Sequence, residues 1–266
     1  MRVLFIGDIV GTPGMQFARR AVPILRKRES LDLVIANAEN AANGSGLYPN
    51  SYKQLRSAGV DAVTLGDHIY KKIEITAILE RDEAICKPAN FPPGAPGREY
   101  VKCVAADGTP VIVISVMGRT FMRPVDCPFL AIDRVLAGLN LPTNAVIIVD
   151  IHAEATADKY LMAHHLNGRA SAVLGTHTHV PTADEQILSG GTAFICDVGM
   201  TGPYDSILGR RVDRVLGATV SFIPQSFDVA DGDVRMGGAI VDIDVQTGRA
   251  TAIRRVMIRE SDISVG

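Results

Sequence analysis

The 266-residue sequence predicts an α/β fold in which buried β-strands alternate with helices. The strands before residue 150 are short and almost continuously apolar, which is typical of a sheet covered on both faces by helices or by another sheet. Segments with helical spacing of apolar residues separate these strands, and two alternating strands close the chain. The length, without internal repeats or linkers, indicates one domain spanning residues 1–266.

The strands are recognised as short runs rich in β-branched and other apolar residues, bounded by turn residues. The expected strands are 3–6, 31–36, 62–65, 100–104, 111–116, 145–149, 172–174, 193–196, 236–245 and 250–258. The fourth and fifth are expected to form a hairpin around Asp107-Gly108, and the last two are expected to form an antiparallel hairpin that closes the fold.

Helices are expected where apolar residues recur every three to four positions. The expected helices are 15–27, 51–58, 72–80, 128–139 and 157–165. Two stretches rich in glycine or proline, 87–97 and 199–209, are expected to be loops. The glycines between residues 7 and 14 fit neither a dinucleotide-binding loop, because Ile9 stands where the second glycine is needed, nor a P-loop.

Composition limits the classes of function. A hydrophobic content of 47% and a charged content of 21% are those of an ordinary soluble globular protein. A net charge of −2 gives no reason to expect a nucleic-acid polymer or a membrane as partner. Cys86, Cys103, Cys127 and Cys196 are scattered, which fits reduced thiols better than disulfides. With no signal peptide and no membrane-length apolar run, a cytoplasmic location is expected.

Polar side chains stand where five of the predicted strands end. They are Asp8, Glu39 with Asn40, Asp67 with His68, His152, and the pair His177 and His179. Function in such sheets collects beyond the carboxyl ends of the strands. Each residue alone could be a turn residue or a helix cap. Five strand ends that offer only carboxylate, carboxamide and imidazole groups indicate a metal site instead, because so dense a cluster needs cations to neutralise it.

The histidines at 177 and 179 follow the apolar run 172–174. Because side chains alternate along an extended chain with a period of two, we expect the two imidazoles to point the same way. Two buried imidazoles side by side are costly unless a partner satisfies their nitrogens, and histidine is the commonest metal ligand.

The ligand types narrow the choice of metal. Without thiolates, structural zinc and iron–sulfur clusters are not expected. Mixed imidazole, carboxylate and carboxamide ligands suit manganese, iron or catalytic zinc. The number of candidate ligands exceeds what one ion needs, whereas two ions about 3.5–4 Å apart, bridged by a carboxylate, would use them all.

In chain order, these residues resemble the sequence blocks of the calcineurin-like metallophosphoesterases. The matching blocks are Gly7-Asp8, Glu39-Asn40, Gly66-Asp67-His68, His152 and Gly175-Thr176-His177-Thr178-His179. The strings at 37–41, 88–92, 152–156 and 197–203 are similar to the bacterial YmdB-like branch, whose members are taken to be 2′,3′-cyclic-nucleotide phosphodiesterases. The resemblance covers nearly the whole chain and implies two packed mixed β-sheets flanked by helices, the four-layer sandwich of that superfamily.

The same resemblance implies a role for each residue. The implied ligands are Asp8, Asn40 and His179 for the first metal ion and Asp67, His152 and His177 for the second, with Glu39 bridging both. His68 matches the catalytic histidine of the family and is expected to donate a proton. The two ions are expected to be iron or manganese, with zinc or magnesium as alternatives, and the family resemblance implies a homo-oligomer.

Two positions depart from the superfamily pattern. Val10 stands where a histidine is usual, a loss that the YmdB-like branch shares and that Asn40 is expected to compensate. Asp67 stands where the family usually has asparagine. The extra carboxylate lowers the net charge of two divalent ions and their ligands from about +2 to about +1, so weaker acidification of the bridging water, or tolerance of a more highly charged ion, is expected. The pH–rate profiles of the wild type and Asp67→Asn should therefore differ.

The implied reaction is hydrolysis of a small 2′,3′-cyclic nucleotide, such as 2′,3′-cyclic AMP, by in-line attack of a metal-bridging hydroxide on phosphorus. His68 would protonate the leaving ribose oxygen. Three alternatives stay open: a phosphomonoesterase or a nuclease built on the same two-metal centre, and a regulatory or scaffold protein of low activity.

Four further residues keep two interpretations each. Arg119 is either a phosphate contact or an ordinary surface cation. Asp150, Glu154 and Asp197 either accept hydrogen bonds from the ligand imidazoles or only cap helices and turns.

Overall fold

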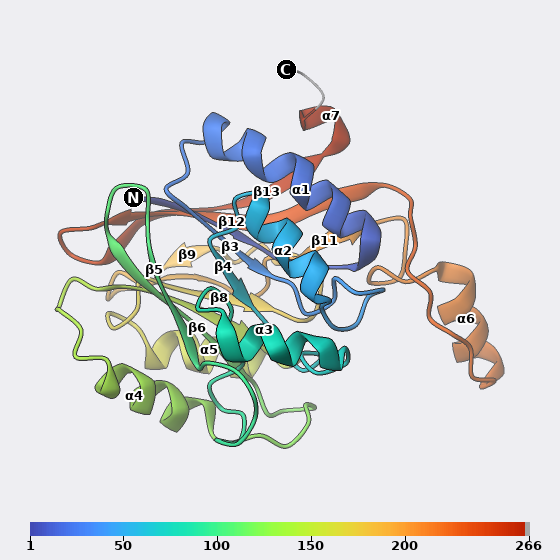
Figure 1. Ribbon diagram of the computed structural model, residues 1–266, viewed down its shortest axis with the longest axis horizontal. Coiled ribbons are helices and arrows are strands. Elements are labelled where there is room, and N and C mark those ends of the chain that lie inside the picture. The colour runs from blue at the N-terminus through green and yellow to red at the C-terminus, as the bar shows by residue number, and fades with distance from the viewer. Residues whose placement is uncertain (264–266) are drawn as a thin grey trace.

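Two β-sheets stack face to face, with helices on the outer face of each sheet (Figure 1). The structure, a computed structural model, describes residues 1–263, so the last three residues of the predicted domain lie outside the described part. Figure 1 shows α1 (Gly11–Arg28) and α2 (Pro49–Ser57) on one side of the stack and α4 (Pro128–Gly138) and α5 (Thr156–His165) on the other. The predicted fold class, two packed mixed sheets flanked by helices, is confirmed.

The first sheet has the order β2-β11-β12-β1-β3-β4, with β13 paired to β12. Its strands are β2 (Asp8–Ile9), β11 (Met200–Pro203), β12 (Val234–Asp244), β1 (Arg2–Ile6), β3 (Leu33–Asn37), β4 (Ala62–Thr64) and β13 (Arg249–Arg259). β1, β3 and β4 run parallel, and β12 pairs antiparallel with both β1 and β13. The closing hairpin predicted from the sequence is therefore part of this sheet.

The second sheet has the order β5-β6-β7-β8-β10-β9. Its strands are β5 (Tyr100–Val104), β6 (Pro110–Met117), β7 (Val146–His152), β8 (Ala172–Thr176), β10 (Ala193–Ile195) and β9 (Gln186–Ile187). The four central strands are parallel, and an antiparallel strand lies at each edge. In the register of the parallel strands, His152 aligns with Met117 and Thr176, so the carboxyl ends of β6, β7 and β8 lie side by side.

Both faces of the central strands are buried, which explains their continuous apolar sequence. Phe5 and Ile35 of the first sheet share one hydrophobic cluster with Ile148 and Leu174 of the second, so these side chains fill the space between the sheets. Their neighbours along the strands belong to two other clusters, which lie under the helices. The alternation of side chains places successive residues of one strand in different layers.

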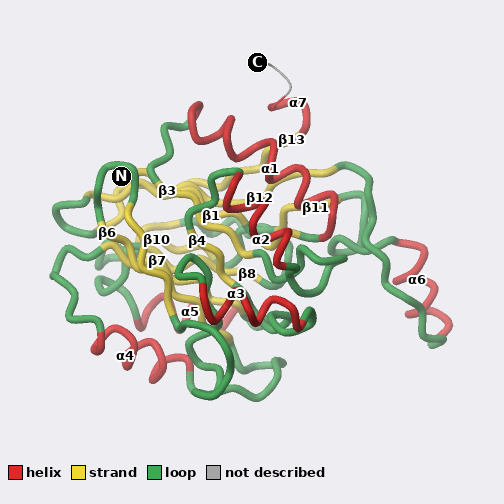
Figure 2. The backbone as a smooth tube through the Cα atoms, viewed as in Figure 1, coloured by secondary structure: helices red, strands yellow, loops and turns green. Residues whose placement is uncertain are grey.

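Every predicted strand and helix is present, with ends that shift by a few residues. The other helical elements are η1 (Ile73–Ile75), a 3₁₀ turn, α3 (Thr76–Arg81), α6 (Val212–Ser221) and α7 (Glu260–Ile263). Figure 2 shows the helices outside the stacked strands and α6 projecting away from the rest of the chain. No prediction from the sequence covered α6, α7 or β9.

Two predictions were wrong in part. The first helix begins at Gly11 rather than at residue 15, because a proline in the first turn, here Pro13, fits a helix and costs no hydrogen bond. The predicted loop 199–209 contains the strand β11. Gly202 in this strand permits a close approach, since a Cβ atom there would lie 3.0 Å from the Cβ of Val10. Within residues 1–263 no helix is both long and apolar enough to cross a membrane.

Candidate metal centre

The carboxyl ends of strands from both sheets meet at one place, and all seven predicted ligands lie there together with His68. Glu39 and Asn40 follow β3, and Asp67 and His68 follow β4 of the first sheet. Asp8 begins β2, His152 ends β7, and His177 and His179 follow β8. The stacking of the sheets, and not only the order of strands within one sheet, therefore brings these side chains together.

One group consists of Glu39, Asp67, His152 and His177, whose ligand-type atoms all lie within 4.8 Å of one another. The Nε2 atom of His152 is 3.2 Å from Glu39 Oε1, 3.1 Å from Asp67 Oδ1 and 3.0 Å from His177 Nδ1. Two carboxylates and two imidazoles at these distances could hold a metal ion.

A second group consists of Asp8, Asn40 and His179. The Asn40 Nδ2 atom lies 3.4 Å from Asp8 Oδ1 and 3.3 Å from His179 Nε2, and His179 Nε2 lies 3.8 Å from Asp8 Oδ1. Glu39 lies between the two groups, because its Oε1 atom is 3.1 Å from Asn40 Nδ2 and 3.2 Å from His152 Nε2. One carboxylate oxygen thus contacts both groups.

The amide of Asn40 directs its NH₂ group toward Asp8 and Glu39, while its Oδ1 atom lies 2.7 Å from His68 Nδ1. An NH₂ group donates hydrogen bonds and does not bind a cation. Asn40 can therefore act as a metal ligand only when its amide is turned over, so that the oxygen faces the carboxylates.

The charges of the centre favour a cation. Burial opposes ionisation of Glu39, but the nearby His152 and hydrogen bonds from His152 and His68 outweigh it and lower the pKa of Glu39. The pKa of Asp67 is also lowered, because hydrogen bonds from His152 and His177 outweigh burial. The pKa of His152 is raised well above its ordinary value, since burial is outweighed by the attraction of Glu39 and the hydrogen bond with Asp67. The carboxylates therefore stabilise a positive charge on His152, and they would stabilise a metal cation at the same place for the same reason.

His68 borders the centre, and its side chain is 30% exposed, so it can reach solvent or a substrate. Its backbone N–H donates to Glu39 Oε2 at 2.9 Å, which fixes the chain beside the carboxylate. The hydrogen bond with Glu39 raises the pKa of His68 in spite of partial burial. His68 therefore lies at the edge of the centre in surroundings that favour its protonated form.

Asp150 supports His152 through an intervening hydroxyl. The Thr176 hydroxyl donates to Asp150 Oδ1 at 2.6 Å, and Thr176 Oγ1 lies 2.8 Å from His152 Nδ1. Because the hydroxyl proton goes to the carboxylate, its oxygen accepts from Nδ1–H of His152, so Nε2 is the ring atom that would bind a cation once it has lost its proton. Burial raises the pKa of Asp150 to about 6. Asp150 thus acts on the imidazole through Thr176 rather than by direct contact.

The same carboxylate also connects the two sheets. Asp150 Oδ2 on β7 accepts hydrogen bonds from Thr64 Oγ1 at 2.6 Å and from Asn37 Nδ2 at 3.0 Å, which belong to β4 and β3. The sequence prediction did not include Asn37, Thr64 or Thr176. What could have identified these three residues in the sequence is a polar side chain at the end of an otherwise apolar strand.

The prediction that His177 and His179 lie in an extended loop and point the same way is wrong. Both residues have positive φ angles, 93° at His177 and 65° at His179. His177 Nδ1 lies 3.4 Å from Asp67 Oδ1, whereas His179 joins Asp8 and Asn40. The left-handed backbone turns the two imidazoles toward different groups of the centre, which a chain with regular alternation cannot do.

The remaining candidates have different surroundings. Glu154 Oε2 lies 3.3 Å from His177 Nε2. This contact agrees with the interpretation that Glu154 accepts a hydrogen bond from a ligand imidazole. Arg119 is exposed, and its backbone N–H donates to Asp158 at 2.8 Å. Asp197 binds Thr178, between the two histidines, instead of an imidazole.

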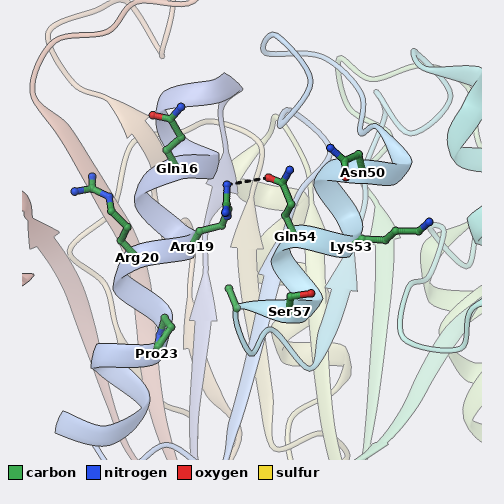
Figure 3. Close-up of a pocket in the computed structure, with 9 residues that line it drawn as sticks. Gln16, Arg19, Arg20, Pro23, Asn50, Lys53, Gln54 and Ser57 are labelled. Carbon is green, nitrogen blue, oxygen red and sulfur yellow. Dashed lines mark hydrogen bonds between the residues drawn. The ribbon is translucent and has the colours of Figure 1, made fainter.

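A groove of about 800 Å³ between α1 and α2 is separate from the centre (Figure 3). It is lined by Gln16, Arg19, Arg20, Pro23, Asn50, Lys53, Gln54, Ser57 and Ala58. Figure 3 shows the hydrogen bond of 3.2 Å from Arg19 to Gln54 across this groove. These lining residues include no carboxylate and no imidazole, so the groove offers none of the groups that the centre provides.

The sequence is similar to known proteins along nearly its whole length. Residues 4–256 match the family model described as YmdB-like protein. Over 262 residues, which cover 98% of both chains, the sequence is 45% identical to a protein of Bacillus subtilis (strain 168) named 2′,3′-cyclic-nucleotide 2′-phosphodiesterase.

Two crystal structures have the same fold. A hypothetical protein from Thermus thermophilus is 45% identical, with a TM-score of 0.91 over 98% of this chain and 100% of that chain. A protein from Mycoplasma pneumoniae described as a novel phosphatase is 26% identical, with a TM-score of 0.90 over 97% of this chain and 93% of that chain. With a family match over most of its length and a relative that is 45% identical almost from end to end, the chain belongs to the YmdB-like family.

Proposed function

We propose that this protein is a phosphodiesterase that hydrolyses 2′,3′-cyclic nucleotides with the help of two bound metal ions. The name of the Bacillus subtilis relative supports the substrate class. The observation that supports two ions is the position of Glu39, whose Oε1 atom lies within hydrogen-bonding distance of both Asn40 and His152 and so between both groups of ligand-type residues.

The residues that would hold the ions fall into the two groups described above. They are Asp8, Asn40 and His179 for one ion and Asp67, His152 and His177 for the other, with Glu39 shared. When bound, the ions would polarise the phosphoryl oxygens and lower the pKa of the attacking water. Oxygen and imidazole nitrogen donors suit iron or manganese, with zinc or magnesium as alternatives.

The side chains of the centre would divide the remaining work. The backbone N–H of His177 donates to Asp8 Oδ2 at 3.0 Å, which holds this carboxylate toward the strand ends of the second sheet. Asp150 and Thr176 would keep His152 oriented with its Nε2 atom beside Glu39 and Asp67, where an ion would be shared with these carboxylates. His68, partly exposed beside Asn40, would give its proton to the leaving ribose oxygen.

Metal analysis followed by turnover assays tests the proposed function. The purified protein should contain about two metal ions per chain and should hydrolyse 2′,3′-cyclic AMP faster than a phosphomonoester or RNA. Preference for the phosphomonoester or for RNA would replace the proposed substrate with one of the alternative enzymes. A metal-loaded protein without turnover on any of the three would be a scaffold.

The His68→Ala variant tests the proton donor. It should keep the metal content of the wild type, because His68 is not among the proposed ligands, and lose about 10²–10⁴-fold in turnover, as is usual when general acid catalysis is removed. His164→Ala, at an exposed position on α5, is the matched control and should turn over like the wild type. Wild-type turnover in His68→Ala would remove His68 from this role.

The cellular setting belongs to the same proposal. The four cysteines are free thiols, and burial raises the pKa of Cys86 to about 12 and that of Cys196 to about 11. Unreactive buried thiols agree with a cytoplasmic enzyme.

A homo-oligomer is supported by α6, a projecting helix of which no residue is buried within the described chain (Figure 1).

A further inference from the structure

Lys159 is a buried cation on α5 that the proposed centre leaves unassigned. Its side chain is 1% exposed, and its Nζ atom donates to Asp197 Oδ2 at 2.8 Å and to Thr178 Oγ1 at 3.3 Å. The Asp197 side chain is fully buried. Because the desolvation of two buried charges offsets most of their attraction, such an ion pair is weak evidence for stability, and its position calls for another explanation.

Asp197 lies two residues after the end of β10, and both oxygens of its carboxylate accept hydrogen bonds. Its Oδ2 atom accepts from the Thr178 backbone N–H at 3.1 Å and from the Thr178 hydroxyl at 2.6 Å, in addition to Lys159. Its Oδ1 atom accepts from the Gly199 N–H at 2.8 Å. Two of these four hydrogen bonds end on one residue, Thr178, so the ion pair is directed at this position of the loop.

The packing around β8 leaves room for this arrangement. A Cβ atom at Gly175 would lie 1.7 Å from the Cys196 carbonyl oxygen and 3.0 Å from Lys159 Cδ. Glycine at 175 therefore permits the segment after β10 and the stem of Lys159 to approach β8 closely. The approach brings Asp197 within reach of the loop that follows β8.

Thr178 stands between His177 and His179, which both have positive φ angles. Side chains with a Cβ atom adopt this conformation only when the surrounding structure imposes it. The hydrogen bonds from the N–H and hydroxyl of Thr178 to Asp197 act on the loop midway between the two histidines. On either side of Thr178, His177 lies beside Asp67 and His179 lies beside Asp8.

We propose that Lys159 and Asp197 are positioning residues, which clasp Thr178 and thereby hold His177 and His179 in the two orientations that a pair of metal ions requires. This inference rests on the proposed two-metal function and adds a role that acts through other residues. Lys159, Asp197 and Thr178 bind neither ion themselves. They orient the imidazoles of His177 and His179 before any ion binds.

A pair of variants at Thr178 tests the clasp. Thr178→Val removes the hydroxyl that Asp197 accepts from and keeps the shape of the side chain, whereas Thr178→Ser keeps the hydroxyl. Titration of metal-free protein with Mn²⁺ should show binding about 10–100-fold weaker in Thr178→Val, a loss typical of residues that orient metal ligands. Thr178→Ser should bind like the wild type.

Two further measurements separate positioning from general stability. Electron paramagnetic resonance of the Mn²⁺-loaded protein should show a coupled pair of ions in the wild type and in Thr178→Ser, and isolated ions in Thr178→Val. Arg2→Met, which breaks the pair of Arg2 with Asp242 at the amino end of β1, is the control for a lost ion pair away from the centre. It should leave the Mn²⁺ affinity unchanged even if it lowers the unfolding temperature.

Lys159→Met and Asp197→Asn extend the test to the ion pair, and both should weaken Mn²⁺ binding in the same direction as Thr178→Val. If either fails to fold, the Thr178 pair decides. Thr178→Val that binds Mn²⁺ with wild-type affinity and gives the coupled signal overturns the inference while leaving the proposed function intact. A wild-type protein that binds no cation overturns both.

Discussion

At Gly66, just before Asp67 and His68, a Cβ atom would lie 2.3 Å from the His152 ring and 2.5 Å from Glu39 Oε2. The backbone at Gly66 therefore passes between two proposed ligands, and no space is left there for a side chain. The chain passes so close to the centre that the type of residue at 66 decides whether His152 and Glu39 can approach each other.

The Gly66→Ala variant should lose bound metal, because its methyl group displaces His152 or Glu39. Elemental analysis of the purified variant measures the effect, and a drop to about half of the wild-type metal content is expected when one of two bound ions is lost. Gly94→Ala is the matched control, since a Cβ atom at Gly94 would have nothing within 4 Å. Full metal content in Gly66→Ala would mean that the centre tolerates the methyl group.

Three residues beneath the centre support its ligands through hydrogen bonds, a role that no sequence motif indicates. Asn37, Thr64 and Thr176 all bond to Asp150, and Thr176 also bonds to His152. A buried carboxylate with these partners is satisfied, whereas a buried carboxylate without them would be costly. The network thus makes a rigid support for the imidazole out of residues that, in the sequence, only interrupt apolar runs.

Among the elements, the apolar runs predicted the central strands well because burial on both faces leaves polar positions mainly toward their carboxyl ends. β11 was not predicted because its glycine and proline are typical of loops, whereas here Gly202 allows close packing against Val10. The helix α6 was not predicted from the sequence for another reason. Its apolar side chains face no core of this chain, so nothing in the folded structure explains their spacing.

α6 carries exposed apolar residues on one side, with Val212 43%, Leu216 54% and Val220 74% exposed. These positions are four residues apart and lie on one stripe of the helix. A second copy of the chain is the partner that agrees with the proposed homo-oligomer. Burial of the stripe between copies would remove from water the apolar surface that the single chain leaves exposed.

The Leu216→Asp variant should lower the molar mass measured by light scattering after size-exclusion chromatography, because a charge in the stripe opposes its burial. Its unfolding temperature as a single chain should change little, since no residue of α6 is buried. Ser221→Asp, on the opposite side of the same helix, is the control and should keep the wild-type mass. An unchanged mass in Leu216→Asp would take α6 out of the oligomer contact.

At the scale of the whole molecule, the centre joins two layers. Asp8 and Glu39 come from the first sheet, and His152 and His177 come from the second. The unfolded chain holds these groups far apart, so metal ions would bind the folded state in preference and stabilise it.

Removal of metal should therefore lower the unfolding temperature. With free metal at about 100 times its dissociation constant, the stabilisation lost is about 2.7 kcal/mol per site. Calorimetry of the metal-loaded protein with and without a chelator measures the difference. His179→Ala, which removes a ligand from one of the two groups, should show a smaller difference. Equal unfolding temperatures for loaded and stripped wild type would show that the ions do not stabilise the two-layer arrangement.

The residue types of the centre and their places at strand ends follow from the sequence alone, because apolar runs must stop where the chain leaves the sheet and polar groups must follow. The central strands and most of the helices follow from it as well. Which of these groups meet depends on how distant segments pack together in three dimensions. The stacking of two sheets brings Glu39 beside His152, and the left-handed backbone at His177 and His179 sends neighbouring imidazoles to different groups. Both arrangements place residues from distant parts of the chain in contact, which local propensity does not encode.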